Sequence, residues 1–594
     1  MDEELERRIE REVEIHALLN ALKHEGDAQV GAIMGPLMGE NPSFREHGEE
    51  IPAIAAPVID RVNALDTAEK RARLAEIAPD RLDALEEEPE TDDHPLPDLP
   101  RVEEYDDVRM RVAPNPNGPW HLGHARMPAV IGTYKDIYDG SFICRFDDTD
   151  PETKRPDLDA YDQILSDIEY LGFEPDDVIR ASDRLETYYD HGRRLIQSGG
   201  AYTCSCDAEA FSEMKNAGEA CEHRSKDVET VRSEFEQMID GEYDEGEMVL
   251  RVKTDIEHKN PALRDWVAFR IVERAHPRSD AASYRCWPML DFQSGIDDHL
   301  TGVTHIIRGI DLQDSAKRQQ FVYDYFGWSY PEVIHWGHVQ VDEYDVRMST
   351  SRIASLIESG DLDGWDDPRA PTLLSLRRRG IRGSAIVDAM VELGTSTSNV
   401  ELSMSAIYAN NRELIDDETD RQFLVRERVD TGSLTADETG PAIGDPSGIG
   451  AVQLSIQDGP ESANPPIHPD HEDRGTRDIP VGDSVLLESS DLPPAGSRVW
   501  LKGFGCVRYD GSVLVYTDDD IEVVREGTVD VVQWVPAENN VPVQLRTPTG
   551  DVYGRAEPGF SSYEPDDVVQ FVRVGFARVD EVSENGVIAF YAHP

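Results

Sequence analysis

The stretch that decides the fold is Arg111-Val-Ala-Pro-Asn-Pro-Asn-Gly-Pro-Trp-His-Leu-Gly-His124, which runs on into Ala125-Arg-Met-Pro-Ala-Val-Ile-Gly-Thr-Tyr134. Because its prolines and glycine oppose a helix between Ala113 and Trp120, we predict a strand ending at Ala113, an extended turn and then a helix. The first turn of a helix offers unpaired N–H groups and a positive dipole end, which favour an anion. The pattern therefore predicts a phosphate site.

Two histidines stand at this helix start. His121 and His124 lie three residues apart, so both imidazoles lie on one helical face, and Gly123 between them leaves room for a flat ring. Taken alone, the pattern fits a nucleotide-phosphate cradle, and it also fits two surface histidines at a helix start. The remainder of the chain decides between these interpretations.

Several ordered motifs carry a family resemblance. His121-Leu-Gly-His124 resembles the HIGH signature of class I aminoacyl-tRNA synthetases, and Val346-Arg-Met-Ser-Thr-Ser-Arg352 resembles their KMSKS signature. Between them, in the family's order, stand Asp291-Phe292, Asp297-Asp298-His299-Leu300 and Thr304-His-Ile-Ile-Arg-Gly-Ile-Asp311. From about residue 100 to residue 430, the chain resembles the glutamyl/glutaminyl branch of that class in its archaeal form.

The resemblance implies a multidomain fold of α/β and β parts. We expect a Rossmann-like catalytic domain with an inserted acceptor-binding domain, a helical connector and C-terminal anticodon-binding β-barrels, preceded by a small helical region. Alternating strands and helices, followed by short apolar runs separated by Gly, Pro and Asp, agree with that order. The expected segments are an N-terminal appendage at 1–85, an acidic linker at 86–100, catalytic halves at 101–200 and 284–365, the insertion at 201–283, the connector at 366–425 and the barrels at 426–594.

The residue patterns also predict individual elements. Helical spacing of apolar residues predicts helices over Leu5–Lys23, Pro57–Ile77 and Thr372–Leu393, with the segment Gly31–Gly39 interrupting the N-terminal helices. We expect a buried strand over Ser141–Phe146, further strands at Ser484–Leu487, Arg498–Lys502, Ser512–Tyr516 and Val568–Val574, and a long loop over Asp445–Asp478.

The activity implied by the resemblance is ATP-dependent ligation of L-glutamate to the 3′ end of tRNA(Glu) through a glutamyl-adenylate. Whether tRNA(Gln) is also charged stays open. ATP and Mg²⁺ are the expected cofactors. The residues carried over are His121, His124, Arg347, Ser349, Ser351 and Arg352 as catalytic groups, and Pro114, Asn115, Pro116, Gly118, His121, Gly123, His124 and Met348 as ATP-binding groups.

The same resemblance supplies a glutamate site. Arg308 is the residue that best distinguishes a glutamyl enzyme from a glutaminyl enzyme. Its guanidinium can bind a substrate carboxylate as a bidentate fork, and glutaminyl enzymes lack this arginine. Leu290 stands where the family usually has Tyr, so Tyr284 or Gln293 is expected to share the hydrogen bonding. The expected glutamate-binding residues are Arg111, Ala113, Asn115, Asp147, Tyr284 and Arg308.

Two alternatives remain at this point. A glutaminyl-tRNA synthetase would share the barrels but not Arg308. A non-catalytic tRNA-binding protein is suggested by the second signature, in which Arg347 and Thr350 take the places of lysines. The intact pair His121 and His124 counts against this second alternative.

Three cysteines and a histidine cluster in the predicted insertion. Cys204-Ser-Cys206 and Cys221-Glu-His223 form the pattern C-x-C…C-x-H, which fits a closed tetrahedral zinc site with a structural role. Some glutamyl-tRNA synthetases have a similar zinc. The alternative is that these are reduced cysteines without a metal.

The charge of the chain is unusual for a protein that binds a polyanion. The net charge is −61, from 119 acidic and 58 basic residues, and only ten of the basic residues are Lys. Acid-rich, Lys-poor surfaces resemble those of halophilic archaea, where concentrated salt screens the repulsion. We expect a cytoplasmic, monomeric protein without a membrane segment. Its tRNA contacts are expected to include the arginine cluster Arg377, Arg378, Arg379 and Arg382.

Overall fold

The computed structural model describes residues 3–23, 28, 33, 37, 44, 51–79, 81–82, 95–341, 349–430 and 449–594. The chain divides into two compact units, Met1–Pro95 and Leu96–Pro594. Among the described residues, no helix combines the length and the apolar character that crossing a bilayer requires.

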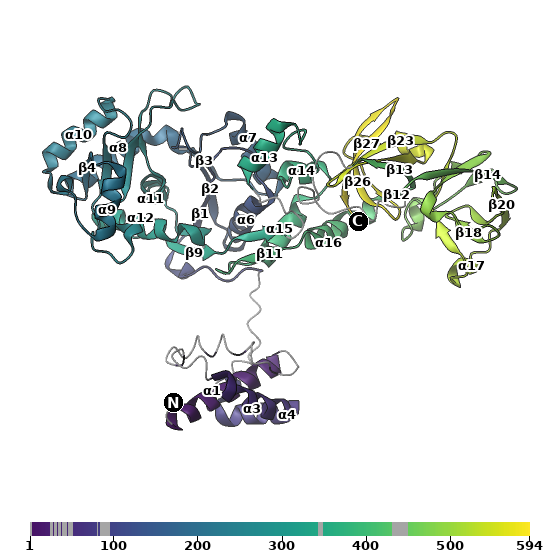
Figure 1. Cartoon of the computed structure of the whole chain (residues 1–594), viewed down its shortest axis with the longest axis horizontal. Helices are drawn as coiled ribbons and strands as arrows, with labels where there is room; N and C mark the ends of the chain where they lie inside the picture. Colours follow the sequence, from purple (N-terminus) through teal and green to yellow (C-terminus); the bar gives the residue numbers. More distant parts are fainter. Residues whose placement is uncertain are drawn as a thin grey trace. The chain divides into compact units, whose positions relative to one another are not determined.

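The first unit is helical, as its apolar spacing predicts. Its helices α1 (Glu3–Lys23), α3 (Ile51–Asn63) and α4 (Thr67–Ile77) bury one shared core and are purple in Figure 1. The single helix expected over Pro57–Ile77 is wrong, because Asp66 and Glu69 form a reciprocal capping box that starts α4. Apart from Ile33 and Leu37, the segment Gly31–Gly39 lies outside the described residues.

The predicted acidic linker ends earlier than its sequence suggests. Residues 86–94 lie outside the described part of the chain, but Leu96 and Leu99 are buried in the core of the second unit. Burial of two leucine side chains favours docking of this segment. Residues 96–100 therefore belong to the second unit and not to a linker.

A parallel sheet organises the first part of the second unit. Strands β1 (Arg109–Val112), β2 (Ser141–Phe146) and β3 (Asp177–Arg180) pair in parallel, and β8 (His305–Gly309) pairs in parallel with β9 (Glu332–Trp336). The amide of Thr304 donates to the carbonyl of Arg109 over 2.8 Å, so β8 starts beside the start of β1. The strand order is thus β3-β2-β1-β8-β9, with all carboxyl ends on one edge. The strand predicted at Ser141–Phe146 has those bounds.

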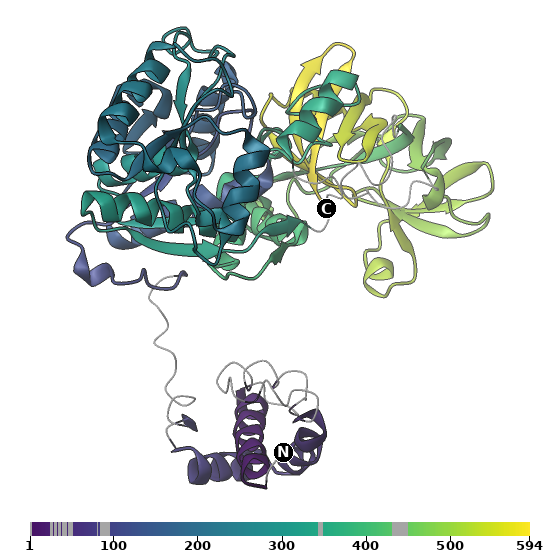
Figure 2. The same cartoon turned by 60° about the vertical axis from the view of Figure 1, so that its left-hand side comes forward.

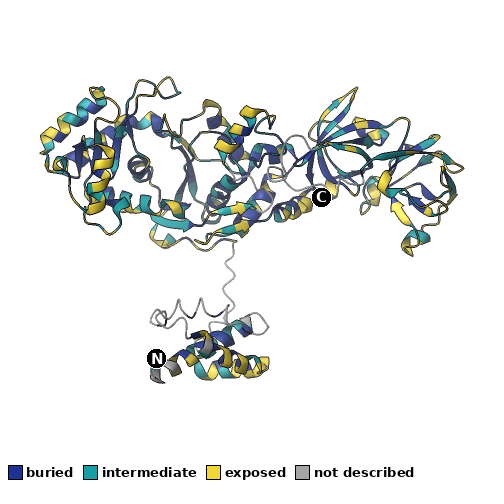
Figure 3. Cartoon of the chain, in the orientation of Figure 1, coloured by how far each residue is buried: buried dark blue, intermediate teal, exposed yellow. Residues whose placement is uncertain are grey.

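Helices cover this sheet. Its central strands β1, β2 and β8 and the helix that follows the histidines are largely buried, whereas the edge strands β3 and β9 are partly exposed (Figure 3). Helix α11 precedes β8 along the chain, and its first turn begins at Leu290. The helices of this part are α6 (Arg126–Tyr138), α7 (Leu158–Tyr170), α8 (Leu185–Gln197), α11 (Leu290–Leu300), α12 (Gln313–Phe326) and α13 (Thr350–Ser359).

An antiparallel sheet lies between the two halves of the parallel sheet along the chain. Its four strands follow one another in the order β4-β5-β6-β7 and pack with two helices of this part and with α8, α11 and α12 around a second core. The elements are β4 (Ala201–Cys204), α9 (Ala208–Ala217), α10 (Val228–Asp240), β5 (Val249–Val252), β6 (Val267–Ile271) and β7 (Cys286–Pro288).

The connecting segment differs from its prediction. The helix expected over Thr372–Leu393 is two helices, α14 (Leu373–Arg378) and α15 (Gly383–Glu392). Gly380 separates them with φ +89, a left-handed conformation that glycine adopts without steric cost. Strands β10 (Val339–Val341) and β11 (Val400–Leu402) pair nearby, and α16 (Met404–Ile415) completes the segment.

Two seven-stranded sheets form the C-terminal part, and Figure 2 shows them from a second direction. One has the order β21-β18-β19-β20-β14-β17-β22, and the other has the order β12-β25-β26-β27-β23-β24-β13. The first contains β14 (Ala451–Gln457), β17 (Ser484–Glu488), β18 (Arg498–Leu501), β19 (Gly505–Tyr509), β20 (Val513–Asp518), β21 (Asp530–Val532) and β22 (Val535–Pro536). The second contains β12 (Asp420–Gln422), β13 (Leu424–Asp430), β23 (Val541–Thr547), β24 (Gly550–Ala556), β25 (Val568–Phe571), β26 (Gly575–Ser583) and β27 (Gly586–His593).

Two predictions for this part need correction. The long loop expected over Asp445–Asp478 contains β14 and the short strand β15 (Ser462–Ala463), which pairs with β16 (Ile479–Pro480). The strand expected over Val568–Val574 ends at Phe571. A hairpin turn follows, in which Arg573 has φ +64. An uninterrupted apolar run does not by itself reveal such a turn.

Candidate active site

A cavity of about 550 Å³ opens where the parallel strands end. Arg111 on β1, Arg145 on β2 and Arg308 on β8 reach it from neighbouring strands, and Asp291 and Ser294 reach it from α11. Ligand sites of open α/β sheets lie at this edge, because the loops that leave the strands diverge there. The cavity is therefore the candidate active site.

Many residues predicted from sequence line the cavity together. They come from β1 and the loop after it, from the first helical turn, and from the ends of β2 and β8. They are Arg111, Ala113, Asn115, Gly123, His124, Asp147 and Arg308.

The two histidines come together at the predicted place. Their ring centroids are 3.8 Å apart, and His121 precedes a short 3-10 turn, Leu122–Ala125, that leads into α6. The His121 amide donates to Nδ1 of His124 over 3.3 Å, which leaves the N–H of the His124 ring on Nε2. Burial lowers the pKa of His121 to about 4 and that of His124 well below its usual value, so both are neutral donors at pH 7.

The loop before the histidines is fixed through its backbone. The carbonyl of Pro114 accepts from the amide of Asp147 at 2.9 Å, and that of Pro116 accepts from the amide of Asp157 at 2.7 Å. Asn115 Nδ2 donates to the carbonyl of Asp147, while its Oδ1 is buried without a hydrogen bond among the described residues. These contacts attach the loop to the segment after β2.

The described end of the second signature lies against the loop that precedes the histidines. A Cβ placed on Gly118 would lie 2.6 Å from Cγ2 of Thr350, at the start of α13. Ser349 is the N-cap of α13, and Ser351 and Arg352 are exposed in its first turn. Arg347 and Met348 lie outside the described residues.

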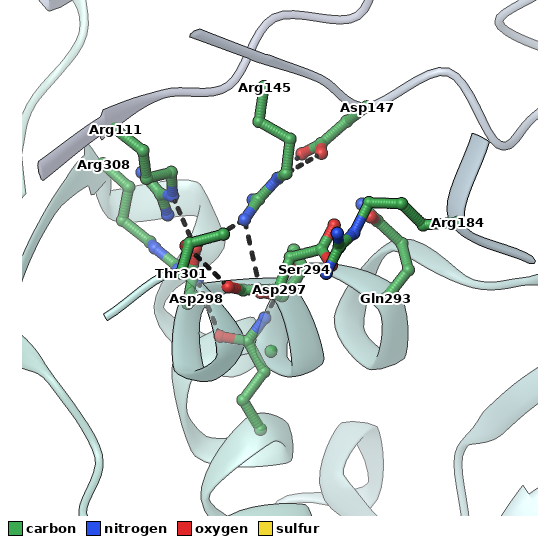
Figure 4. Close-up of polar contacts among 12 residues, drawn as sticks. Arg111, Arg145, Asp147, Arg184, Gln293, Ser294, Asp297, Asp298, Thr301 and Arg308 are labelled. Carbon is green, nitrogen blue, oxygen red and sulfur yellow. Dashed lines mark hydrogen bonds and ion pairs between the residues drawn. The ribbon is translucent and has the colours of Figure 1, made fainter. Parts of the chain in front are cut away.

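Three arginines of the cavity floor, Arg111, Arg145 and Arg308, converge on one carboxylate beneath them, that of Asp298 (Figure 4). Asp298 on α11 has no exposed surface and accepts from Arg145 Nη1 at 2.6 Å and from Arg111 Nε at 3.1 Å. Nη2 of Arg308 lies 3.9 Å from Asp298 Oδ2. Burial opposes ionisation of Asp298, but the three arginines outweigh it and hold its pKa below the usual value.

Arg145 was expected only to follow a strand beside Asp147, and Asp298 was named only within the motif Asp297-Asp298-His299-Leu300, so neither was among the predicted site residues. A charged residue in the otherwise apolar run Ser141–Phe146 and two adjacent aspartates in a buried helix were the available signals. No sequence pattern pointed to the wall residues Trp336, Gly337, His338 and Val339.

Tyr284 is not brought to the cavity. Its hydroxyl points towards Glu186 at 3.5 Å, and its ring packs 6.3 Å from that of Tyr189. Gln293, the other residue expected to compensate for Leu290, is buried below the cavity with its Nε2 unpaired among the described residues. Leu290 itself lines the cavity and is 41% exposed.

The predicted metal ligands cluster in the antiparallel-sheet part. The ligand atoms of Cys204, Cys206, Cys221 and His223 all lie within 4.8 Å of one another. The sulfurs of Cys204 and Cys221 are 3.9 Å apart, near the roughly 3.8 Å that tetrahedral bonds of about 2.3 Å require. Ser205 Oγ lies 3.1 Å from Nε2 of His223, on the ring side opposite Nδ1, and such partners orient metal-bound histidines.

The arginine cluster after α14 separates into different roles. Arg379 is fully buried and donates to the carbonyls of Tyr591 and Ala592, so its prediction as a phosphate contact is wrong. Arg378 forms ion pairs with Asp366 and Asp580. Only Arg377 and Arg382 of this cluster have exposed side chains.

Comparison with known proteins adds sequence relationships to this geometry. Residues 107–417 match the model of the catalytic domain of class I tRNA synthetases (E and Q), and residues 449–526 and 531–580 match two models of anticodon-binding domains of that class. The chain is 67% identical to a glutamate–tRNA ligase of Natronomonas pharaonis and 66% identical to one of Halobacterium salinarum, over 100% of each chain. It is 41% identical to a glutamate–tRNA ligase of Methanosarcina acetivorans, over 98% of each chain.

Proposed function

Because the chain belongs to the glutamate–tRNA ligases among the class I (E and Q) tRNA synthetases, we propose that it ligates L-glutamate to tRNA in the cavity described above. One observation carries the choice of substrate. Arg111 and Arg308 enter the cavity from adjacent strands and can bind a carboxylate that glutamine lacks.

We place ATP over the first helical turn and the loop before it. The neutral imidazoles of His121 and His124 would donate to phosphate oxygens, and Gly123 lets the nucleotide approach the backbone closely. Ser349, Ser351, Arg352 and the residues before them would face the leaving pyrophosphate. Mg²⁺ carried by the phosphates would neutralise part of their charge.

The two reaction steps depend more on positioning of the reactants than on proton transfer by a side chain. The glutamate α-carboxylate attacks the α-phosphorus of ATP to give glutamyl-adenylate and pyrophosphate. A terminal ribose hydroxyl of tRNA then attacks the glutamyl carbonyl and accepts the glutamyl group, and AMP leaves. The reaction would be accelerated by holding the reactants in line and by fixed hydrogen-bond donors that stabilise the phosphoryl oxygens. Asp147, whose carboxylate accepts from Arg145 Nε at 2.8 Å, lies where it could bind the substrate ammonium group.

The test is charging of total tRNA in molar potassium chloride with labelled glutamate or glutamine in parallel. We expect glutamate transfer, and its distribution between tRNA(Glu) and tRNA(Gln) reveals the tRNA specificity. Replacing Arg308 by Ala should raise the KM for glutamate about 10- to 100-fold, because a charged hydrogen-bond partner is lost, while the KM for ATP should stay unchanged. Transfer of glutamine alone, or unchanged glutamate kinetics in Arg308→Ala, would contradict the proposal.

For the cysteine cluster we propose a structural zinc ion held by Cys204, Cys206, Cys221 and His223. Four protein ligands leave no open position for catalysis, so the ion would stabilise the segment around β4. Metal analysis of protein purified without chelator should find about one zinc per chain. Cys206→Ser should lower that content, whereas Cys286→Ala, at a buried cysteine outside the cluster, should not. Absence of zinc from the wild-type protein would refute this proposal.

For tRNA we propose that the two C-terminal sheets carry the anticodon contact and that Arg377 and Arg382 contact phosphates of the backbone. The match to anticodon-binding domain models supports the first part, and the exposed guanidinium groups support the second.

A further inference from the structure

One buried carboxylate, that of Asp298, lies beside the three arginine side chains of the cavity floor. Asp298 binds Arg111 and Arg145 through its Oδ1, and its Oδ2 faces Arg308 (Figure 4). The three guanidinium groups come from three different strands, and all three side chains are buried. Without a shared anion they would repel one another in a site that excludes most water.

The hydrogen bonds divide the arginines into two kinds. Arg145 is fully engaged, with Nε and Nη2 directed at Asp147 and Nη1 at Asp298. Arg111 uses only its Nε on Asp298. Arg308 donates through Nη1 to Gln319 Oε1 at 3.3 Å, while its Nη2 lies 3.9 Å from Asp298, which is too long for a hydrogen bond. Asp298 therefore attracts Arg111 and Arg308 while leaving donors on both for a ligand.

The charge of this group matches one particular ligand. Three guanidinium groups face two carboxylates, those of Asp147 and Asp298, so the group carries one net positive charge. On the cavity wall, Asp150 and Asp291 are paired with Arg270 and Arg318, and Asp311, Lys154 and Arg126 also line the wall outside this group. Free glutamate carries one net negative charge at pH 7 and glutamine carries none.

We propose that Asp298 is a positioning residue that determines specificity for glutamate. Its charge holds Arg111 and Arg308 with free donors towards the substrate carboxylate, and it limits the group to the single positive charge that glutamate neutralises. This inference rests on the proposed glutamate activity and deepens it. It identifies Asp298 as the residue that orients the carboxylate-binding arginines Arg111 and Arg308.

The chain offers a matched control at the next position. Asp297 is also fully buried in α11, but it accepts from Arg184 at 2.7 Å and from Tyr188 at 2.5 Å. Neither of these partners lines the cavity. Replacing either aspartate by Asn changes one buried carboxyl group of the same helix, but only Asp298 is in direct contact with the arginines that line the cavity.

The test compares Asp298→Asn and Asp297→Asn in glutamate charging at molar potassium chloride. For Asp298→Asn we expect the KM for glutamate to rise about tenfold or more, with the KM for ATP within about twofold of wild type. For Asp297→Asn we expect a lower Tm and an unchanged KM for glutamate. Equal effects of the two variants on the KM for glutamate, or equal effects of Asp298→Asn on both substrates, would overturn the inference.

A second variant keeps the test decisive if Asp298→Asn does not fold. Asp298→Glu keeps the charge but moves it by one methylene group, so we expect a smaller rise in the KM for glutamate than Asn causes, again without an effect on ATP. An Asp298→Glu enzyme with an unchanged KM for glutamate, or with an equally raised KM for ATP, contradicts the inference. If the wild-type protein transfers no glutamate at all, the proposed function fails first.

Discussion

At the scale of single residues, the loop that precedes the histidines rests on a carboxyl group whose pKa is raised by burial. Asp167 on α7 accepts from the Trp120 amide at 3.4 Å and from Gln163 Nε2 at 3.0 Å. Burial raises its pKa to about 7, whereas an unfolded chain leaves it near 3.9. Between these values the folded protein holds a proton that the unfolded chain releases, so the free energy of unfolding falls as pH rises through this window.

Replacing Asp167 by Asn removes this pH dependence. We expect the Tm difference between Asp167→Asn and wild type to grow from about pH 4 to about pH 7 in favour of the variant and to stay constant above pH 7. Thermal unfolding in molar potassium chloride measures it. Asp162→Asn, at an exposed position of the same helix, is the control. A difference that does not change with pH would show that Asp167 is ionised in the folded protein.

At the scale of elements, sequence predicts best where one local pattern decides the structure. The strand Ser141–Phe146 and the turn before His121 follow from an apolar run and from prolines, which act locally. The break at Gly380 was missed because apolar spacing continues through it, and only packing decides whether a glycine ends a helix. Pro57 lies inside α3, although proline usually marks a helix boundary.

The site shows the same division between local and tertiary information. His121, His124 and Arg308 stand in motifs, so their type and spacing identified them. Asp298 acquires its role only when β1, β2 and β8 come together above α11. Arg379 looked like a phosphate contact because it stands among other arginines, and only the fold shows that it donates to the carbonyls before His593.

At the scale of the whole molecule, the two C-terminal sheets repeat one plan. Each has the strand pairings parallel, antiparallel, antiparallel, parallel, antiparallel and antiparallel along its order. The hairpin glycines Gly505 and Gly575 both have φ +137, and each lies against a tyrosine ring, that of Tyr516 or Tyr591. The sheets are thus equivalent strand by strand.

The equivalent strands are exchanged along the chain. The short pair β12 and β13 precedes β14–β20 but joins the sheet of β23–β27, while β21 and β22 precede β23–β27 but join the sheet of β14–β20. Buried ion pairs cross between the sheets, from Arg426 to Glu488 at 2.8 Å and from Arg477 to Glu557 at 2.9 Å. Each sheet therefore contains strands that adjoin strands of the other sheet along the chain. Unfolding of one sheet should consequently destabilise the other.

This exchange predicts that the two sheets unfold together. Phe560 is fully buried in the core of the second sheet, so Phe560→Ala should cost about 3 kcal/mol or more in the full-length protein. Hydrogen exchange under native conditions should then show an equal loss of protection in β18, β19 and β20 of the first sheet. Leu74→Ala, in the separate core of α1, α3 and α4, should leave both sheets unchanged. If β18–β20 keep wild-type protection in Phe560→Ala, each sheet is an independent folding unit in spite of the exchanged strands.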